Sequence, residues 1–192
     1  FELLNLSTIN YIGDLISWCS IGARNSESQN HRQVVSGLNI PTGFKNSTSG
    51  NIESCISSLF VAKEKNTFCH ISMNNIVEII KTGGNSNCHI ILRGSDNSPN
   101  YHIDNIKKAK KIINYLKYKN IMIDCSHGNS RKDYKKQGNV FKYICSLIKK
   151  DNKIVIGMML ESHLNEGKQE FKCGYKNISS RLSITDSCIS IK

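Results

Sequence analysis

No apolar run in this sequence approaches the roughly 18 residues that a membrane-spanning helix needs. No basic segment followed by an apolar stretch marks a signal peptide at its start either. The 192 residues are enough for one domain with a hydrophobic core. The first residue is Phe1, in a short segment with the pattern of a strand end. We therefore expect a soluble piece of a longer protein, with no membrane partner.

Paired cysteine motifs are also missing, because the chain has eight cysteines but no CxxC pair. This argues against a zinc ribbon and a redox motif. Most of the cysteines, such as Cys19, Cys55 and Cys145, stand singly in apolar stretches, where a free thiol behaves as a small hydrophobic side chain. This pattern predicts a reducing compartment, and we expect the protein in the cytoplasm.

Arginine is scarce among the basic residues: five of the 26 are Arg and the other 21 are Lys. The net charge of +11 raises the question of a nucleic-acid partner. The abundance of Lys, Asn and Ile is typical of an AT-rich coding bias, however. The densest basic run, residues 107–111, lies on a predicted helix whose opposite face is apolar. We therefore expect a solvated helix face, and no nucleic-acid partner.

A repeated unit is present instead, in which a short apolar run ends at a functional residue and a helical pattern follows. Such alternation predicts βα units and a parallel sheet. The runs are residues 18–23 ending at Arg24, 41–44 at Lys45, 88–92 at Arg93, 121–126 at His127 and 154–160 at Glu161. Helices are predicted at 52–60, 103–116 and 134–148, and an inserted β-hairpin at 67–80. Because catalytic groups of a (β/α)8 barrel come from the carboxyl ends of its strands, we expect a TIM barrel. Residues 1–192 are then one partial barrel domain with roughly the last five βα units.

Three of these strand ends carry cations, namely Arg24, Lys45 and Arg93. Desolvated like charges at one barrel mouth are costly unless an anion compensates them. Arg suits bidentate recognition of phosphate or carboxylate, and Lys provides a point charge. The predicted ligand therefore carries phosphate, with a carboxylate as its second anionic group.

His127 and Glu161 end the other two runs, and Asp186 lies after the last predicted strand. An imidazole with carboxylates suits manganese, iron or zinc, so the three residues are candidate ligands of a divalent metal. Taken alone, Asp186 fits a helix N-cap equally well. We expect His89 to pack in the core, and Cys125 to point into the barrel with His127 as core filling.

At this point the sequence resembles the type I 3-deoxy-D-arabino-heptulosonate-7-phosphate (DAHP) synthases over almost its whole length. The resemblance rests on the order and spacing of its motifs. These are residues 17–24 (SWCSIGAR) with Glu27-Ser28-Gln29 and His31-Arg32, 43–46 (GFKN), 88–94 (CHIILRG), 122–124 (MID), Ser126-His127, Asn129-Ser130, 135–137 (KKQ), 161–164 (ESHL), Glu166-Gly167 and 183–186 (SITD).

The resemblance implies the condensation of phosphoenolpyruvate with erythrose 4-phosphate and water to DAHP and phosphate, the first step of the shikimate pathway. It implies one divalent ion, Mn, Fe, Co or Zn, that polarises the aldehyde. It also implies a homo-oligomer, either a dimer or a tetramer, and an aromatic amino acid effector near the hairpin. By the family pattern, phosphoenolpyruvate is held by Glu2, Gly22, Ala23, Arg24, Lys45 and Arg93. The metal is held by His127, Glu161 and Asp186, and the catalytic residues are Lys45 and His127.

Several parts of the family pattern are not found in these residues. Relatives have a further metal-binding Cys, another phosphoenolpyruvate Arg and a Lys-Pro-Arg-Thr segment that grips erythrose 4-phosphate. We therefore expect this polypeptide alone to be inactive. Three alternatives stay open: a related barrel that acts on arabinose 5-phosphate, an inactive remnant that retains only subunit contacts, and a basic nucleic-acid binder.

Overall fold

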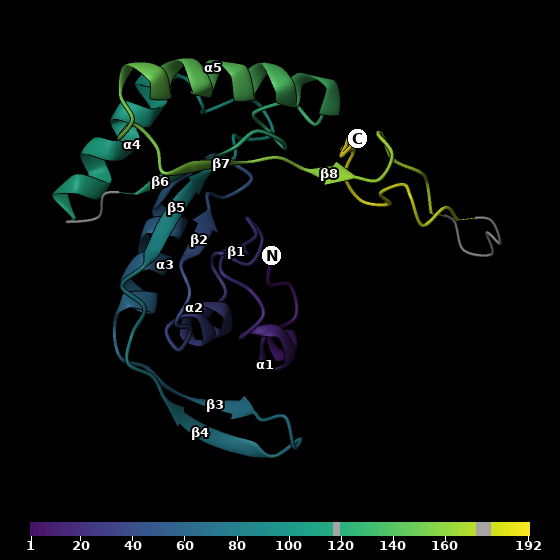
Figure 1. The fold of residues 1–192 in the computed structure, drawn as a ribbon. Helices are drawn as coiled ribbons and strands as arrows, with labels where there is room; N and C mark the ends of the chain where they lie inside the picture. The colour runs from purple at the N-terminus through teal and green to yellow at the C-terminus, as the bar shows by residue number, and fades with distance from the viewer. Residues whose placement is uncertain (117–119, 172–177) are drawn as a thin grey trace.

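The computed structural model describes residues 1–116, 120–171 and 178–192. Its centre is a curled sheet of five parallel strands in the order β1 (Cys19–Ile21), β2 (Thr42–Lys45), β5 (Cys88–Leu92), β6 (Ile121–Asp124) and β7 (Gly157–Met159) (Figure 1). Each lies within one of the five predicted runs, so the parallel sheet is confirmed. The last strand is shorter than its run of 154–160, because only residues 157–159 pair with β6.

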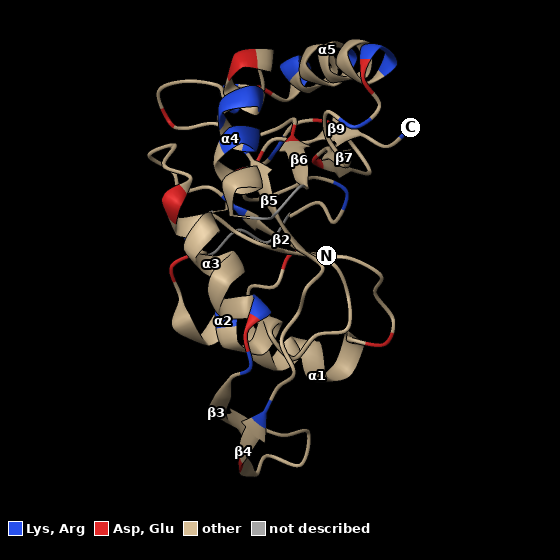
Figure 2. Ribbon diagram, turned by 90° about the vertical axis from the view of Figure 1, so that its left-hand side faces the viewer, with Lys and Arg blue, Asp and Glu red and all other residues tan. Residues whose placement is uncertain are grey.

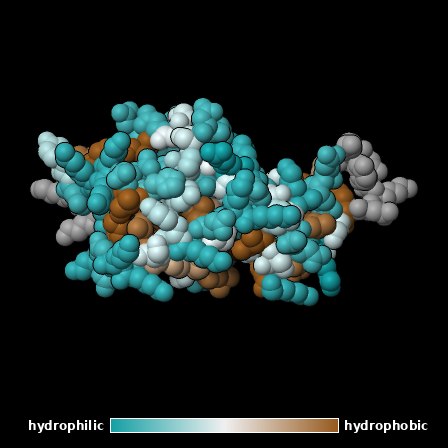
Figure 3. All heavy atoms as spheres, turned by 90° about the horizontal axis from the view of Figure 1, so that it is seen from above, coloured by the Kyte–Doolittle hydropathy of each residue, from teal (hydrophilic) through white to brown (hydrophobic). Residues whose placement is uncertain are grey.

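Helices cover the outer side of this half-barrel, as Figure 1 shows for α3 (Glu53–Lys63), α4 (Ile103–Tyr115) and α5 (Gln137–Lys150). Together with α2 (Gln29–Val35) they follow the strands as the sequence pattern predicts. The predicted helix at 134–148 begins as a 3-10 turn, η2 (Tyr134–Lys136), before α5. Figure 2 marks the basic residues in blue, including those of α4. Lys107, Lys108 and Lys111 are exposed, while Ile106 and Ile113 are buried. Hydrophilic residues also cover much of the face seen in Figure 3.

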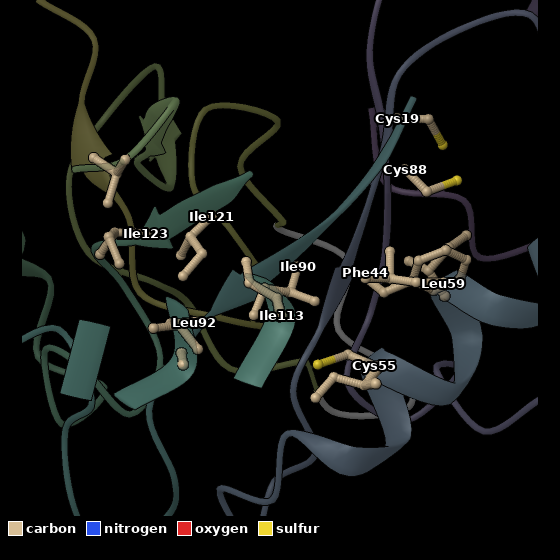
Figure 4. Packing of buried hydrophobic residues seen from close by; sticks show 14 of the residues in the cluster. Cys19, Phe44, Cys55, Leu59, Cys88, Ile90, Leu92, Ile113, Ile121 and Ile123 are labelled. Carbon is tan, nitrogen blue, oxygen red and sulfur yellow. The ribbon is translucent and has the colours of Figure 1, made fainter. Parts of the chain in front are cut away.

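The hydrophobic core lies between the sheet and these helices (Figure 4). Alternate strand residues such as Phe44, Ile90 and Ile123 point into it, because side chains of a strand alternate between its two faces. Cys125 belongs to the same core, so it is core filling as expected, but on the helix side of the sheet and not inside the barrel. The alternation places it on the side of Ile123, opposite Asp124.

The inserted hairpin is confirmed as β3 (Thr67–Ile71) paired antiparallel with β4 (Val77–Lys81). It extends away from the sheet in Figure 1. Asn75 takes a positive φ of 59° in its turn, a conformation that Asn tolerates better than most residues. Val77 and Ile79 are 68% and 73% exposed, so this hairpin buries little apolar surface of its own.

The two ends of the chain lie beside the sheet. At the start, where η1 (Leu6–Thr8) and α1 (Ile9–Ile12) follow, Glu2 forms a parallel bridge with Ser20 of β1, which agrees with the predicted strand end. At the other end β8 (Ser162–His163) pairs with β9 (Ile189–Ser190). Asp186 lies between β8 and β9, and it therefore follows β7, the last strand of the parallel sheet, as expected. Among the described residues, no helix is long and apolar enough to cross a membrane.

Candidate active site

A cavity of about 250 Å³ opens at the carboxyl ends of the parallel strands. The carboxyl ends of neighbouring parallel strands meet at one edge of a sheet, which brings distant segments together there. All six residues predicted to hold the anion line this cavity, and so do two of the three predicted metal ligands. The lining residues are Glu2, Leu4, Gly22, Ala23, Arg24, Asn25, Lys45, Thr48, Arg93, His127, Thr185 and Asp186.

Lys45, the last residue of β2, is 2% exposed and lies between two carboxylates. Its Nζ is 2.7 Å from Glu2 Oε2 and 3.5 Å from Asp124 Oδ2. Burial by itself lowers the pKa of Lys45, but the attraction of Asp124 and Glu2 outweighs burial, and the pKa is raised. Gly22 lets Glu2 approach, because a Cβ at Gly22 would lie 2.7 Å from Glu2 Oε1.

Arg93 follows β5 and is 4% exposed. Its Nε and Nη1 have no hydrogen-bond partner among the residues that the structure describes, although both atoms are buried. Buried donors are almost always paired, so these two atoms call for an acceptor supplied by a ligand. Arg24 lies on the same cavity and is exposed. The three predicted cations therefore converge on one cavity, as the sequence indicates.

His127, Glu161 and Asp186 form a cluster whose possible ligand atoms all lie within 4.8 Å of one another. His127 Nε2 is 3.3 Å from Glu161 Oε1 and 3.8 Å from Asp186 Oδ2. One imidazole nitrogen and two carboxylates are a donor set that suits divalent manganese, iron, cobalt or zinc. Burial raises the pKa of Glu161, while the facing His127 and the Ser126 hydroxyl oppose that shift.

Glu161 is held at both its side chain and its main chain. Ser126 Oγ donates to Glu161 Oε2 at 2.7 Å. The fully buried Gln137, at the start of α5, accepts from Glu161 N at 2.9 Å and donates to Glu161 O at 3.2 Å. Asp186 has a half-exposed side chain by contrast. The cluster thus combines a fixed carboxylate with one that is open to solvent.

Asp124, the last residue of β6, is fully buried beneath His127. Its Oδ2 accepts from His127 Nδ1 at 2.8 Å, so the other ring nitrogen, Nε2, faces the carboxylate cluster. Burial would raise the pKa of Asp124, but the hydrogen bond from His127 and the charge of Lys45 together lower it. His127 itself has a positive φ of 47°, an unusual backbone conformation of the kind that concentrates at functional sites.

Three asparagines tie the loops around the cavity together. Asn46 Oδ1 accepts from Arg93 N at 2.8 Å, and Asn100 Oδ1 accepts from Gly94 N at 2.7 Å. Asn129 Nδ2 donates to the backbone oxygens of both Leu92 and Asp124. Asn129 thus fixes the ends of β5 and β6 relative to each other, and Asn46 joins the ends of β2 and β5.

Sequence reasoning assigned no role to Asp124, Ser126 or Gln137. The signal for Asp124 was present, because an acid within an apolar strand must find partners when it is buried. The partners of Ser126 and Gln137 depend on how β7 and α5 lie against β6, which the local pattern does not specify.

Two other histidines lie outside the cavity. His89 is 2% exposed and accepts a hydrogen bond from Trp18 Nε1 at 3.1 Å, so it packs in the interior as expected. Burial lowers the pKa of His89 to about 4. His163 lies in β8, and its Nδ1 is 2.6 Å from the backbone oxygen of Arg181.

Comparison with known proteins gives one consistent family. A family model described as "DAHP synthetase I family" matches residues 1–192. The Tyr-sensitive phospho-2-dehydro-3-deoxyheptonate aldolase of Escherichia coli K12 is 39% identical over 190 residues, covering 98% of this chain and 53% of the relative. A putative phospho-2-dehydro-3-deoxyheptonate aldolase of Schizosaccharomyces pombe is 42% identical over 190 residues, covering 98% of this chain and 52% of the relative.

A solved structure is similar in fold as well. The phospho-2-dehydro-3-deoxyheptonate aldolase from Francisella tularensis SCHU S4 superposes with a TM-score of 0.91 at 36% identity. The match covers 98% of this chain and 55% of that one. The chain thus spans about half the length of these relatives.

Proposed function

Because the chain belongs to the DAHP synthetase I family, we propose that it carries part of the active site of a DAHP synthase. The proposed reaction condenses phosphoenolpyruvate with erythrose 4-phosphate and water to give DAHP and phosphate. The observation that carries the proposal is the buried Arg93 guanidinium, whose Nε and Nη1 lack partners in a cavity shared with Lys45 and His127. A ligand with a phosphate and a carboxylate meets that demand.

Phosphoenolpyruvate is the substrate that we assign to this cavity. Arg93 binds one anionic group through charge-assisted hydrogen bonds, and Arg24 at the rim binds the other. Lys45 supplies a buried positive charge, while Glu2 holds its ammonium in place. The main chain of Gly22 and Ala23 completes the lining.

The metal is the proposed cofactor, held by His127, Glu161 and Asp186. When bound, a divalent ion supplies Lewis acidity that polarises the aldehyde under attack by the enol carbon. The chain's own contribution is to orient these ligands: Asp124 fixes the ring of His127, and Ser126 and Gln137 fix Glu161. Manganese, iron, cobalt and zinc all fit this donor set.

The chain matches only part of each relative, and this limits the activity that we propose for it alone. It spans about half of their length, and we propose that the remaining (β/α)8 barrel strands and the erythrose 4-phosphate contacts belong to residues outside these 192. We therefore expect binding of phosphoenolpyruvate and metal, but no condensation, from this polypeptide. The alternative is an inactive remnant that retains only subunit contacts, which binds neither ligand.

A second pocket, of about 320 Å³, lies between residues 5–7, α2 and β3. It combines polar groups of Asn5, Ser7 and Asn30 with the apolar side chains of Val34 and Phe68. We assign it to an aromatic amino acid effector, since the Escherichia coli relative is named Tyr-sensitive. Tyrosine should raise the Tm of the chain, and Phe68→Ala should remove this shift. We also propose a cytoplasmic homo-oligomer, a dimer or a tetramer.

Calorimetric titration of the chain with phosphoenolpyruvate tests the main proposal. Arg93→Gln should weaken binding by about 10- to 100-fold, because it removes charge-assisted hydrogen bonds worth roughly 1.5–3 kcal/mol. Arg131→Gln is the matched control, since Arg131 is an exposed arginine outside the cavity. Equal affinity of the parent and the Arg93 variant would contradict the assignment, and absence of binding by the parent would favour the remnant.

A further inference from the structure

Asp124 connects the two halves of the candidate site through a single oxygen atom. Its Oδ2 is 2.8 Å from His127 Nδ1 and 3.5 Å from Lys45 Nζ. Its Oδ1 is already engaged, because it accepts from Ser126 N at 2.8 Å. The carboxylate is fully buried, so water does not compete for these contacts. A chain of close contacts therefore runs from Lys45 on the anion side to His127 on the metal side.

The backbone around Asp124 is fixed as well. Asn129 Nδ2 donates to the backbone oxygen of Asp124 at 2.8 Å and to that of Leu92 at 3.0 Å. A backbone shift at Asp124 that would carry the carboxylate toward Lys45 or His127 is therefore opposed. A change in the contacts of Lys45 therefore changes the charge that Asp124 Oδ2 presents to His127 Nδ1.

Lys45 and His127 share Oδ2, and each has a second partner on its own side. Lys45 Nζ lies on the cavity that Arg93 and Arg24 also line. An anion bound there attracts the ammonium and weakens its hold on Oδ2. The bond from His127 Nδ1 to Asp124 Oδ2 then strengthens, and Nε2 stays directed at Glu161 and Asp186. In the opposite direction, an ion at Nε2 polarises the ring and strengthens the Nδ1 contact with Oδ2, which releases Lys45 toward the anion.

We propose that Asp124 is a positioning residue through which anion binding at Lys45 and metal binding at His127 favour each other. This inference rests on the proposed function, since it takes phosphoenolpyruvate and a divalent ion as the two ligands. It adds a regulation of that site: neither half reaches full affinity until the other is filled. Linkage requires the effect to be equal in both directions.

Direct attraction between a bound anion and a nearby cation also couples the two sites. The contribution of Asp124 is separable because the chain offers matched groups outside the contact chain. Glu2 is a second carboxylate on Lys45 Nζ, at 2.7 Å, but its contacts do not reach His127. Arg24 is a second cation on the same cavity, and it is exposed at the rim. Removing either weakens anion binding and leaves Oδ2 in place.

The experiment measures the affinity of the 192-residue chain for Co²⁺, by its visible absorption, with and without saturating phosphoenolpyruvate. The ratio of the two dissociation constants is the coupling factor, expected to be on the order of tenfold in the parent. Asp124→Asn and Lys45→Gln should each lose most of this factor. Glu2→Gln and Arg24→Gln should keep it within about twofold of the parent's factor, although both bind phosphoenolpyruvate more weakly. If Asp124→Asn does not fold, the comparison of Lys45→Gln with Arg24→Gln decides the question.

The Co²⁺ titrations separate a failure of the inference from a failure of the proposed function. Loss of the factor in the Asp124 and Lys45 variants alone supports the inference. An unchanged factor in those variants, an equal loss in all four, or a parent factor of one overturns it while the proposed function stands. A parent chain that binds neither Co²⁺ nor phosphoenolpyruvate overturns the proposed function, and the inference falls with it.

Discussion

At the carboxyl end of the sheet, Lys45, Arg93 and Asp124 are buried charges, whereas the amino end of the same sheet carries Trp18 and His89 as a neutral pair. His89 accepts from Trp18 Nε1 at 3.1 Å, and burial lowers its pKa to about 4, so it stays uncharged at neutral pH. Both ends are closely packed, yet Arg93 at the carboxyl end keeps two buried donors, Nε and Nη1, without partners among the described residues. Residues at the amino end stabilise the fold, and those at the carboxyl end are held ready for ligands. Substitutions at the two ends should therefore affect different measurements.

The largest effect is expected from His127→Ala at the carboxyl end. It removes one ligand of the cluster, and a structural zinc site with four ligands binds with roughly 10–16 kcal/mol, so one ligand contributes roughly 2.5–4 kcal/mol. Metal affinity should fall by about 100- to 1,000-fold. The urea midpoint should fall as well, because the buried Asp124 carboxylate loses the bond from His127 and keeps only Lys45 as a charged partner among the described residues. His70→Ala on the hairpin is the control. A large loss of stability with intact metal binding would reverse the comparison.

The next largest effect is the pH dependence of the free energy of unfolding, which His89 at the amino end of the sheet should produce. The folded chain holds His89 neutral to about pH 4, while the unfolded chain takes up a proton below about pH 6.5. The unfolded state binds more protons in this window, so the free energy of unfolding should fall as the pH drops from about 6.5 to about 4. The loss should approach about 3 kcal/mol, and above pH 6.5 this contribution is fully present.

Trp18 is the only tryptophan in the chain and reports on this pair by fluorescence. Protonated His89 would turn an N–H toward the indole N–H, so the pair should separate. Urea titrations at several pH values should show a flatter pH dependence in His89→Gln. The same slope in the parent and in this variant would assign the loss to other groups.

A smaller loss of stability is expected from a substitution at Gly43 in β2, which packs against two side chains of β5. A Cβ at Gly43 would lie 2.5 Å from Ile91 Cδ1 and 2.8 Å from His89 Nε2. Because Ile91 and His89 are both buried, Gly43→Ala should destabilise the fold by about 1–3 kcal/mol. Gly138→Ala is the control, since a Cβ there meets nothing within 4 Å and Ala favours the helix. Equal stability of the two variants would show that the interior can adjust.

The five parallel strands and their order were predictable because each apolar run ends at a charged residue and a helical pattern follows it. The convergence of Arg24, Lys45 and Arg93 was predictable for the same reason, since parallel strands share one carboxyl edge. The hairpin was also visible in the sequence as two short apolar stretches around a turn. These features depend on periodicity and on chain order, both of which a single sequence contains.

The supports of the site were not predictable in this way. Ser126 and Gln137 act on Glu161 across 35 and 24 residues of sequence, through contacts set by the packing of α5 and β7 on β6. Cys125 was assigned to the wrong side, because His127 leaves the strand with a positive φ and no longer follows the alternation. Asp186 was a candidate ligand because it follows the last predicted strand, but the pattern fitted a helix N-cap equally well, and the family resemblance favoured the ligand.

The smallest effect sharpens the comparison within the carboxyl end itself. Ser126→Ala removes the hydroxyl that donates to Glu161 Oε2 at 2.7 Å, while Gln137 still holds the Glu161 backbone. Metal affinity should fall by about tenfold, or about 1.4 kcal/mol, the lower end of what partners of metal ligands contribute. Ser130→Ala is the matched control, because Ser130 is also buried and, among the described residues, its hydroxyl bonds only the backbone oxygen of His127, at 3.4 Å. Titration with Co²⁺ measures both. If Ser126→Ala bound metal as tightly as the parent, Gln137 alone would suffice to hold Glu161, and the side-chain bond would serve the fold.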